Sequence, residues 1–407
     1  MRHPTAIAAC AVALASLGIA ACGSSSPSTS SGGSSTKTPF TVLAIVASSG
    51  PLAAVTASEM QGMAEGAKYV NAHGGIDGHK VQVIVKNDND DPTTAATILQ
   101  SYLSGGSAPN VVYAGTTSTE TYAMEPILTQ AKVLSQQTAT SDQTMDPAKF
   151  PYAFSLASSS ADFGFELAHA IKARYPNVKK IGMLLGNDVT GSSNLHNELL
   201  ALHQEGYSTV VKQYDPTNTV NMTPQLEALR AQNPQLLIAG GFGAPAGYIL
   251  KGRAQIGWNV PLVGDASFSS NPLPSMASAS ELQGVSVLST QNQVYVPLNK
   301  HSQAFQTLYK AVLPSSGTFA VPFLLYAFGW DDIMVAKAAA TQAGSFTTAA
   351  MVHALENLKD PTAPDFLLGP YHYTASTHTA IADLNAAVLV SPYTKDGQSL
   401  PFGQTTG

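Results

Sequence analysis

A run of small hydroxyl residues is the part of this sequence best suited to hold a small molecule. Residues 115–119 read Gly-Thr-Thr-Ser-Thr, between a short apolar stretch and a segment with helical spacing. The first backbone N–H groups of a helix have no partner within it, and the helix dipole adds a positive field there. Such a turn can bind an anionic group such as a carboxylate, which makes Thr116, Thr117 and Ser118 candidate contacts. The same hydroxyls could instead only cap the helix.

Further candidate contacts follow other predicted strands. A ligand of an open parallel sheet lies beyond the carboxyl ends of the strands, so residues just after each strand are the ones to consider. In the first half of the chain these are Gln137, Thr138 and Ala139. In the second half they are Thr190, Phe242 and Asp265.

The sequence has no pattern of residues typical of a catalytic or metal site. Asp88, Asp90 and Asp91 lack the glycine and the distal glutamate of a calcium-binding EF-hand loop. The ten histidines form no H-E-x-x-H motif, and no G-x-S-x-G marks a nucleophilic serine. We therefore predict no enzyme activity, no metal and no cofactor.

One segment does offer an alternative. Residues 241–246 read Gly-Phe-Gly-Ala-Pro-Ala after a predicted strand, and Asp265 follows at about the distance that a dinucleotide-binding fingerprint requires. Phe242 would crowd the approach of a pyrophosphate. A dinucleotide-dependent enzyme is therefore kept as a remote alternative.

The elements that would position these residues alternate between strand and helix. Predicted strands cover 40–46, 80–86, 111–113, 133–135, 180–185, 208–214, 235–239, 261–263 and 285–288. Predicted helices cover 58–72, 92–102, 119–131, 161–175, 192–205, 223–232, 245–256, 300–312, 326–343 and 347–357. Strands separated by helices of this length indicate βαβ units with parallel sheets. The series occurs twice, which predicts two lobes of similar construction.

The first residues resemble an export signal. Arg2 is followed by an apolar run too short to span a bilayer, which ends at Leu-Gly-Ile-Ala-Ala-Cys at residues 17–22. This resembles a bacterial lipoprotein signal, with Cys22 as the lipidated residue; an ordinary signal peptide with Cys22 incidental is the alternative. Residues 23–38 are rich in Ser, Gly and Thr and are typical of a tether.

Composition limits the classes of partner. The chain has 20 basic and 26 acidic residues and a formal net charge of −6, which argues against a nucleic-acid-binding surface. Its two cysteines, Cys10 and Cys22, leave no disulfide for the body that follows the signal.

Four stretches together resemble the periplasmic binding proteins for branched-chain amino acids and related solutes. They are Ser-Ser-Gly-Pro-Leu at 48–52, the helix end Asn-Ala-His-Gly-Gly-Ile-Asp-Gly at 71–78, Asn-Asp-Asn-Asp-Asp-Pro at 87–92, and Gly-Gly-Phe at 240–242 leading to 257–265. The resemblance implies an α/β fold of two Rossmann-like lobes with parallel sheets joined by three hinge crossings. We expect these crossings near 155–160, 289–293 and 376–382.

The resemblance also implies roles for the candidate contacts. In the family, the counterparts of Thr117 and Ser118 hold an amino-acid carboxylate, and the loop containing Thr138 binds the amino-acid head group. Phe242 stands where relatives carry a tyrosine that packs on the ligand, and Thr190 where they often carry an aromatic residue.

Two positions depart from the leucine-type pattern. Ala266 stands where relatives place a carboxylate for the ligand ammonium, and Val55 replaces a pocket aromatic residue. A buried ammonium without a carboxylate would cost several kcal/mol. Either Asp265 or Asp188 therefore takes that role, or the solute is not a zwitterion.

The resulting expectation is an extracytoplasmic lipoprotein, anchored to the cell membrane through Cys22, that binds a solute as a monomer. It would capture a small polar solute, an amino acid or a related amide or carboxylate, and deliver it to an ABC permease; a ligand sensor of the same fold is the alternative. We expect a signal at 1–22, a tether at 23–38, a first lobe of 40–157 plus 290–378, a second lobe of 158–289 plus 379–395, and a tail of 396–407.

Overall fold

A computed structural model describes residues 37–106, 108–380 and 387–405. Cys22 and the predicted signal, and most of the predicted tether, lie outside these residues. Five parallel strands form the first sheet, in the order β2-β1-β3-β4-β5. They are β1 (Phe40–Val46), β2 (Val81–Asn87), β3 (Val111–Ala114), β4 (Leu134–Gln137) and β5 (Ala153–Ser155).

Side chains of β1 alternate between two apolar layers, as the period of a strand requires. Val42 and Ala44 pack with α1 (Ala53–Ala72), α10 (Gln303–Val312), α11 (Phe323–Ala343) and α12 (Thr348–Glu356). Leu43 and Ile45 pack on the opposite face with α2 (Pro92–Ser104) and α3 (Ser118–Ala131). Both faces of this sheet are therefore covered by helices, which explains why the central strands β1 and β3 are almost entirely apolar and buried.

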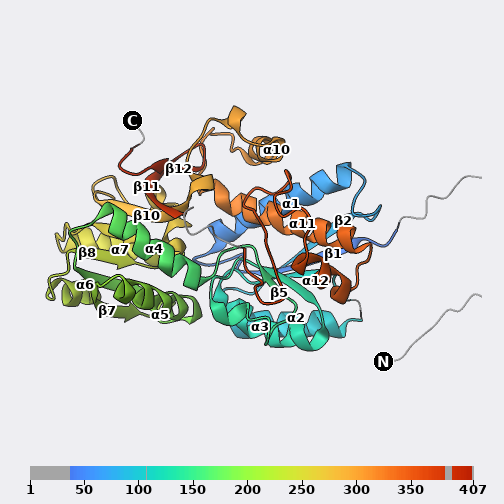
Figure 1. Cartoon of the computed structure of the whole chain (residues 1–407), viewed down its shortest axis with the longest axis horizontal. Coiled ribbons are helices and arrows are strands. Elements are labelled where there is room, and N and C mark those ends of the chain that lie inside the picture. The colour runs from blue at the N-terminus through green and yellow to red at the C-terminus, as the bar shows by residue number, and fades with distance from the viewer. Residues whose placement is uncertain (1–36, 107, 381–386, 406–407) are drawn as a thin grey trace, which may run out of the picture. The chain divides into compact units, whose positions relative to one another are not determined.

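The second sheet repeats the strand order of the first. Its parallel part runs β7-β6-β8-β9-β10, which matches β2-β1-β3-β4-β5 strand for strand. The strands are β6 (Lys180–Gly186), β7 (Ser208–Tyr214), β8 (Leu236–Ala239), β9 (Leu262–Gly264) and β10 (Val285–Thr290). One face packs with α4 (Ser160–Arg174) and α5 (Val189–Gln204), and the other with α6 (Thr223–Arg230) and α7 (Ala244–Gln255) (Figure 1).

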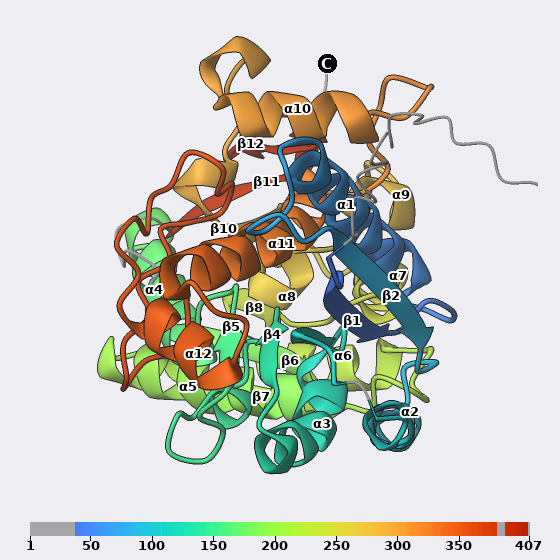
Figure 2. The ribbon, with the colours of Figure 1, turned by 90° about the vertical axis from the view of Figure 1, so that its right-hand side faces the viewer.

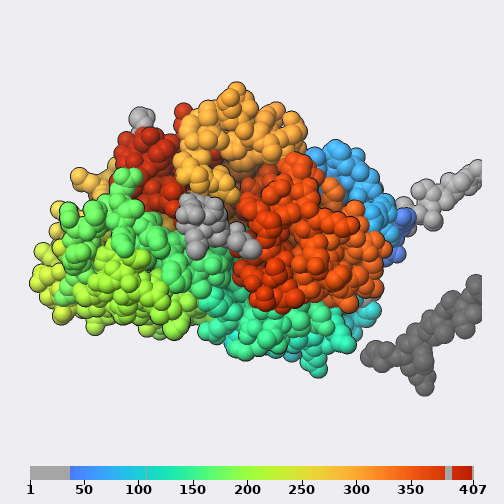
Figure 3. Space-filling view, viewed as in Figure 1, coloured from blue at the N-terminus to red at the C-terminus, as the bar shows by residue number. Residues whose placement is uncertain are grey.

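Two further strands extend the second sheet beyond β10. β11 (Ala387–Lys395) pairs antiparallel with β10, and β12 (Gln398–Pro401) pairs antiparallel with β11. Residues 396–407, expected as a tail, therefore contain the edge strand of this sheet. Tyr295 N also donates to the Ser399 carbonyl oxygen (2.8 Å), which joins the edge to the segment that leads into α10. Figure 3 shows that amber segment between the dark-red C-terminal strands and blue α1.

We call the first sheet with its helices the first lobe, and the second sheet with its helices the second lobe. The helices and strands predicted up to residue 357 are all present with ends moved by a few residues; the largest difference is α1, which begins at Ala53 instead of Ser58. The two-lobed α/β fold with parallel sheets is confirmed. None of the described helices is both long enough and apolar enough to cross a bilayer.

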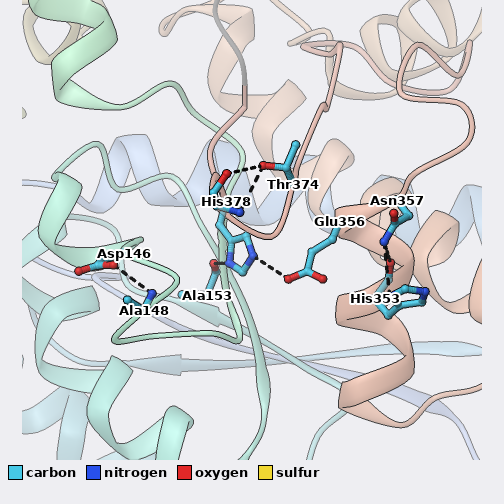
Figure 4. Close-up of polar contacts among 9 residues, drawn as sticks. Asp146, Ala148, Ala153, His353, Glu356, Asn357, Thr374 and His378 are labelled. Atoms are coloured by element: carbon cyan, nitrogen blue, oxygen red, sulfur yellow. Dashed lines mark hydrogen bonds and ion pairs between the residues drawn. The ribbon is translucent and has the colours of Figure 1, made fainter.

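The chain passes between the lobes after β5, after β10 and before β11. The described part of the third passage is residues 371–380, and residues 381–386 lie outside the described residues. His378 holds the start of this passage in place, because its ring stacks on Phe154 with 3.9 Å between the centroids. Its Nδ1 lies 3.0 Å from the backbone oxygen of Ala153, and its Nε2 lies 3.3 Å from Glu356 Oε1 (Figure 4). Burial lowers the pKa of His378.

Helices α1 and α11 lie next to each other (Figure 2). Their backbones approach closely because each helix has a glycine at the contact. A Cβ on Gly329 would lie 1.8 Å from the backbone carbonyl oxygen of Glu59. A Cβ on Gly62 would lie 1.9 Å from the backbone carbonyl oxygen of Tyr326. Backbone atoms cannot yield as a side chain can, so only glycine fits at this crossing.

Gly329→Ala should therefore destabilise the protein by about 1–3 kcal/mol, the usual cost of overpacking a core. Gly247→Ala in α7 is the matched control, because its new methyl group would be 3.4 Å from Met276 Cβ, an ordinary contact. We expect the control to be neutral or slightly stabilising, since alanine favours a helix. Denaturant unfolding of both variants tests this, and equal stability for the two would contradict the crossing geometry.

Candidate functional site

A cavity of about 610 Å³ lies at the carboxyl ends of strands from both sheets. In each sheet the strand order reverses once, between β1 and β3 and between β6 and β8, so the loops that leave these neighbouring strands diverge and open a crevice. The loops after β3 and β8 contribute Thr116–Glu120 and Gly240–Phe242 to the wall. The repeated topology therefore builds one cavity from two equivalent crevices.

The predicted contacts meet at this cavity, with one exception. Its wall includes Thr116, Thr117, Ser118, Thr138, Ala139, Thr190, Phe242 and Asp265. Gln137 does not line the cavity: it is buried, and its Nε2 donates to the Thr144 oxygen (2.9 Å). The reason is that β4 continues through Gln137 instead of ending at Ser135, so the loop begins two residues later. Val55 likewise lies inside α1, buried in the first lobe's core.

The start of α3 is closed by a capping box. Thr117 N and Thr117 Oγ1 both donate to Glu120 Oε2, the former at 2.9 Å, and Thr119 N donates to Thr117 Oγ1 at 3.3 Å. Ser118 N donates to Thr190 Oγ1 of α5 in the second lobe (3.3 Å), and Ser118 Oγ accepts from Ser141 N (3.3 Å). The amides expected to bind a carboxylate thus have partners within the protein.

Glu120 is the residue of this turn that sequence reasoning missed. Its side chain lines the cavity, although the residue is only 1 % exposed. Burial raises the pKa of Glu120 well above its usual range, and a hydrogen bond with the Asp90 carboxyl group adds to the rise. The available signal was the spacing Thr-x-x-Glu over residues 117–120, which is the pattern of a capping box.

The two acids considered for a ligand ammonium differ in their surroundings. Asp265 is buried and caps the short helix α8 (Ala266–Ser269): Oδ1 accepts from Phe268 N (2.9 Å) and Ser267 Oγ (2.6 Å), and Oδ2 accepts from Asn194 Nδ2 (3.0 Å). Burial raises its pKa. Its oxygens are therefore already used by the second lobe.

Asp188 is less enclosed and caps α5, where Oδ1 accepts from Gly191 N (3.0 Å). Burial raises the pKa of Asp188, and the charge of Asp90 in the first lobe adds to the rise. Asp90 follows β2, is exposed, and lines the same cavity. Of the two acids, Asp188 is therefore the better placed for a charged ligand.

The turn considered as a dinucleotide fingerprint has few donors to offer. Gly241 N donates to Ser267 Oγ (3.0 Å), and Gly243 N donates to Asn271 Oδ1 (2.7 Å). Asp265, which would have to meet a ribose, is buried with both oxygens bonded. These contacts disfavour the remote dinucleotide alternative.

Apolar side chains of both lobes also line the cavity, and we call them the apolar wall. They include Leu52, Phe163, Phe242, Leu288 and Phe328. Phe242 packs against the core of the first lobe, and the next residue, Gly243, turns at a φ of 75° directly against Leu52. A Cβ at Gly243 would lie 2.6 Å from Leu52 Cδ2, so the lobes touch at this wall.

All the Asp, Glu, Lys, Arg and His side chains of the described cavity wall are acids. The described wall includes the carboxyl groups of Glu59, Asp90, Glu120, Asp188 and Asp265, and within that wall there is no Lys, Arg or His. Burial raises the pKa of Glu59 to about 8. Throughout the part of the chain that the structure describes, no group of three or more His, Cys, Asp or Glu residues is arranged to hold a metal ion.

Comparison with known proteins identifies the fold and its family. The family model described as periplasmic binding protein matches residues 39–398. A type 1 periplasmic binding protein from Bordetella pertussis Tohama I is similar in structure, with a TM-score of 0.77 and 16 % identity over 89 % of this chain and 100 % of that one. No curated protein matches the sequence.

Two similar structures contain ligands. A solute-binding protein of an ABC transporter from Rhodopseudomonas palustris BisB5, in complex with 3,4-dihydroxybenzoic acid, has a TM-score of 0.72 and 18 % identity over 89 % of this chain and 95 % of that one. A branched-chain amino acid transporter substrate-binding protein from Streptococcus pneumoniae, in complex with isoleucine, has a TM-score of 0.68 and 18 % identity over 89 % and 97 %.

Proposed function

Because the chain belongs to the periplasmic binding protein family, we propose that it is an extracytoplasmic solute-binding lipoprotein of an ABC transporter. It captures one small polar solute between its lobes and delivers it to a membrane permease, with a lipid on Cys22 as its anchor. The family and the fold are those of substrate-binding receptors and not of enzymes, and the family is extracytoplasmic.

The observation that carries the proposal is the shared cavity. Both sheets direct the carboxyl ends of their strands at it, and its volume is within the range of about 300–1,000 Å³ usual for small-molecule sites. Direct contacts between the lobes, such as Ser118 N to Thr190 Oγ1, lie at its edge. A solute bound there would contact both lobes at once and stabilise their closure.

A thermal-shift screen of the purified chain tests the proposal. The panel holds amino acids, amines, amides, small carboxylates and sugars. A solute at about 100 times its Kd adds about 2.7 kcal/mol of stability, which raises the unfolding temperature by several degrees. A rise in the unfolding temperature with at least one class of compound supports solute binding. No rise with any compound of the panel counts against it. Neighbouring genes for a permease and an ATPase support transport, whereas a neighbouring receptor gene would favour a sensor.

Phe242→Ala should weaken solute binding about tenfold or more, because burying a phenylalanine side chain against a ligand contributes about 1.5–3 kcal/mol. Tyr122→Ala is the control, since Tyr122 is exposed on α3 and does not line the cavity. Isothermal titration with the best solute of the screen measures both. Equal affinity in the two variants would remove Phe242 from the site.

A further inference from the structure

We infer that the solute is an organic cation without a carboxylate group: an amine or a guanidinium on an apolar body. This inference rests on the proposed function and names the class of solute that the cavity takes. It departs from the sequence expectation, which placed a solute carboxylate on Thr117 and Ser118.

The first argument is that a carboxyl group of the protein already holds the position for an anion. Glu120 accepts hydrogen bonds from the amide and the hydroxyl of Thr117 at the start of α3, as a bound carboxylate would. The next amide, Ser118 N, donates to Thr190. A solute carboxylate would therefore find these donors in use and would lie beside the carboxyl groups of Glu120 and Asp90.

The second argument is the sign of the remaining charges. A basic side chain would stabilise the carboxylate of an anionic or zwitterionic solute most, and the described wall of the cavity offers no Lys, Arg or His. The side-chain donors of that wall, such as the unpartnered Thr119 Oγ1, are neutral. Asp90 of the first lobe and Asp188 of the second repel each other when both are ionised, and a cation between them turns that repulsion into attraction. Closure of the lobes would then depend on the cation.

The third argument concerns where the charge lies and what surrounds the rest of the solute. Glu59, Glu120 and Asp265 are all buried, whereas Asp90 is exposed and Asp188 is only partly buried. Asp90 and Asp188 are therefore the carboxylates most accessible to a cationic head. The apolar wall that includes Leu52, Phe242 and Phe328 would take an apolar body. A bare metal ion does not fit, since the described residues form no metal-binding group.

Matched sets of compounds that differ in one group test the inference by isothermal titration. One set is 2-phenylethylamine, phenylalanine, 3-phenylpropanoate and 3-phenylpropanamide; the second is 3-methylbutylamine, leucine, 4-methylpentanoate and 4-methylpentanamide. In at least one set we expect the amine to bind ten or more times tighter than the amino acid, and the carboxylate not to bind. Tighter binding of the carboxylate, the amino acid or the amide would overturn the inference and leave the proposed function intact. If no compound of either set and no compound of the broader panel binds, the result would count against both the inference and the proposed function.

Asp188→Asn and Asp90→Asn test the position of the head group without disturbing the backbone. Asparagine caps a helix as aspartate does, and it tolerates the left-handed conformation of Asp90, whose φ is 61°. Each variant should weaken amine binding tenfold or more and leave the unfolding temperature of the free protein unchanged or higher. Glu227→Gln, an exposed acid outside the cavity, is the control and should bind normally. Full affinity in both asparagine variants would contradict the assignment.

Discussion

Ala266→Trp should weaken solute binding strongly, by up to about 100-fold, while the protein stays folded. Ala266 is the first residue of α8, is half-buried, and lines the cavity directly after β9. An indole group there would occupy the space between the lobes that the solute needs and would also oppose their closure. Because overpacking a well-filled site costs about 1–3 kcal/mol, we expect affinity to fall by about 100-fold at the upper end of that range.

Ala231→Trp is the matched control for this substitution. Ala231 ends α6 on the exposed surface and does not contribute to the cavity. Titration should show wild-type affinity for the control, and circular dichroism should show the same helix content for both variants. Wild-type affinity in Ala266→Trp would place the solute elsewhere.

Raising the pH from about 5 to about 8 should lower the unfolding temperature substantially. Burial raises the pKa of Glu59, Glu125 and Asp332 to about 8 and that of Asp331 to about 7. The folded chain therefore keeps protons that the unfolded chain loses above about pH 4.5. The stability that these groups contribute is complete below the pKa that they have in the unfolded chain. It is lost as the pH rises through the pKa that they have in the folded chain, and the free energy of unfolding falls by up to about 1.4 kcal/mol per group and pH unit.

His378 acts in the opposite direction, because burial lowers its pKa and its protonation below about pH 6.5 favours the unfolded chain. It is one group against at least the four acids named above, and burial also raises the pKa of Glu120, Asp188 and Asp265. The net slope of unfolding temperature against pH should therefore stay negative between about pH 5 and 8. Glu125→Gln checks the cause, since its carboxyl group accepts from Ser135 Oγ (2.6 Å) far from the cavity wall and a glutamine keeps that bond. The slope of unfolding temperature against pH should flatten in this variant; an unchanged slope would contradict the role of Glu125.

The sequence predicted most elements between residues 40 and 357, because both lobes alternate buried strands with helices. The short elements β5, α8 and α9 (Leu273–Met276) were not predicted, since segments of three or four residues show no clear period. The C-terminal strands β11 and β12 were harder to predict, since β11 is partly exposed and contains Pro392, and antiparallel edge strands carry weak patterns. The loops of the site could be predicted because parallel sheets place them at strand ends.

The chemistry of the site was less accessible from sequence. Thr117 and Ser118 line the cavity, but only coordinates show that Glu120 and Thr190 already accept hydrogen bonds from their amides. Phe328 comes from α11, more than 200 residues beyond Thr117, and no local pattern connects the two. The acidic sign of the cavity likewise arises from residues scattered over both lobes.

Hydrogen–deuterium exchange with and without a saturating solute tests the central claim most directly, that one solute binds between the lobes. Binding should slow exchange in peptides covering 115–120 of the first lobe and both 186–191 and 240–243 of the second, because all three loops line the cavity. Peptides of β2 and α12 should exchange as before. Protection in one lobe alone, or only at segments remote from these loops, would contradict capture of the solute between the two lobes.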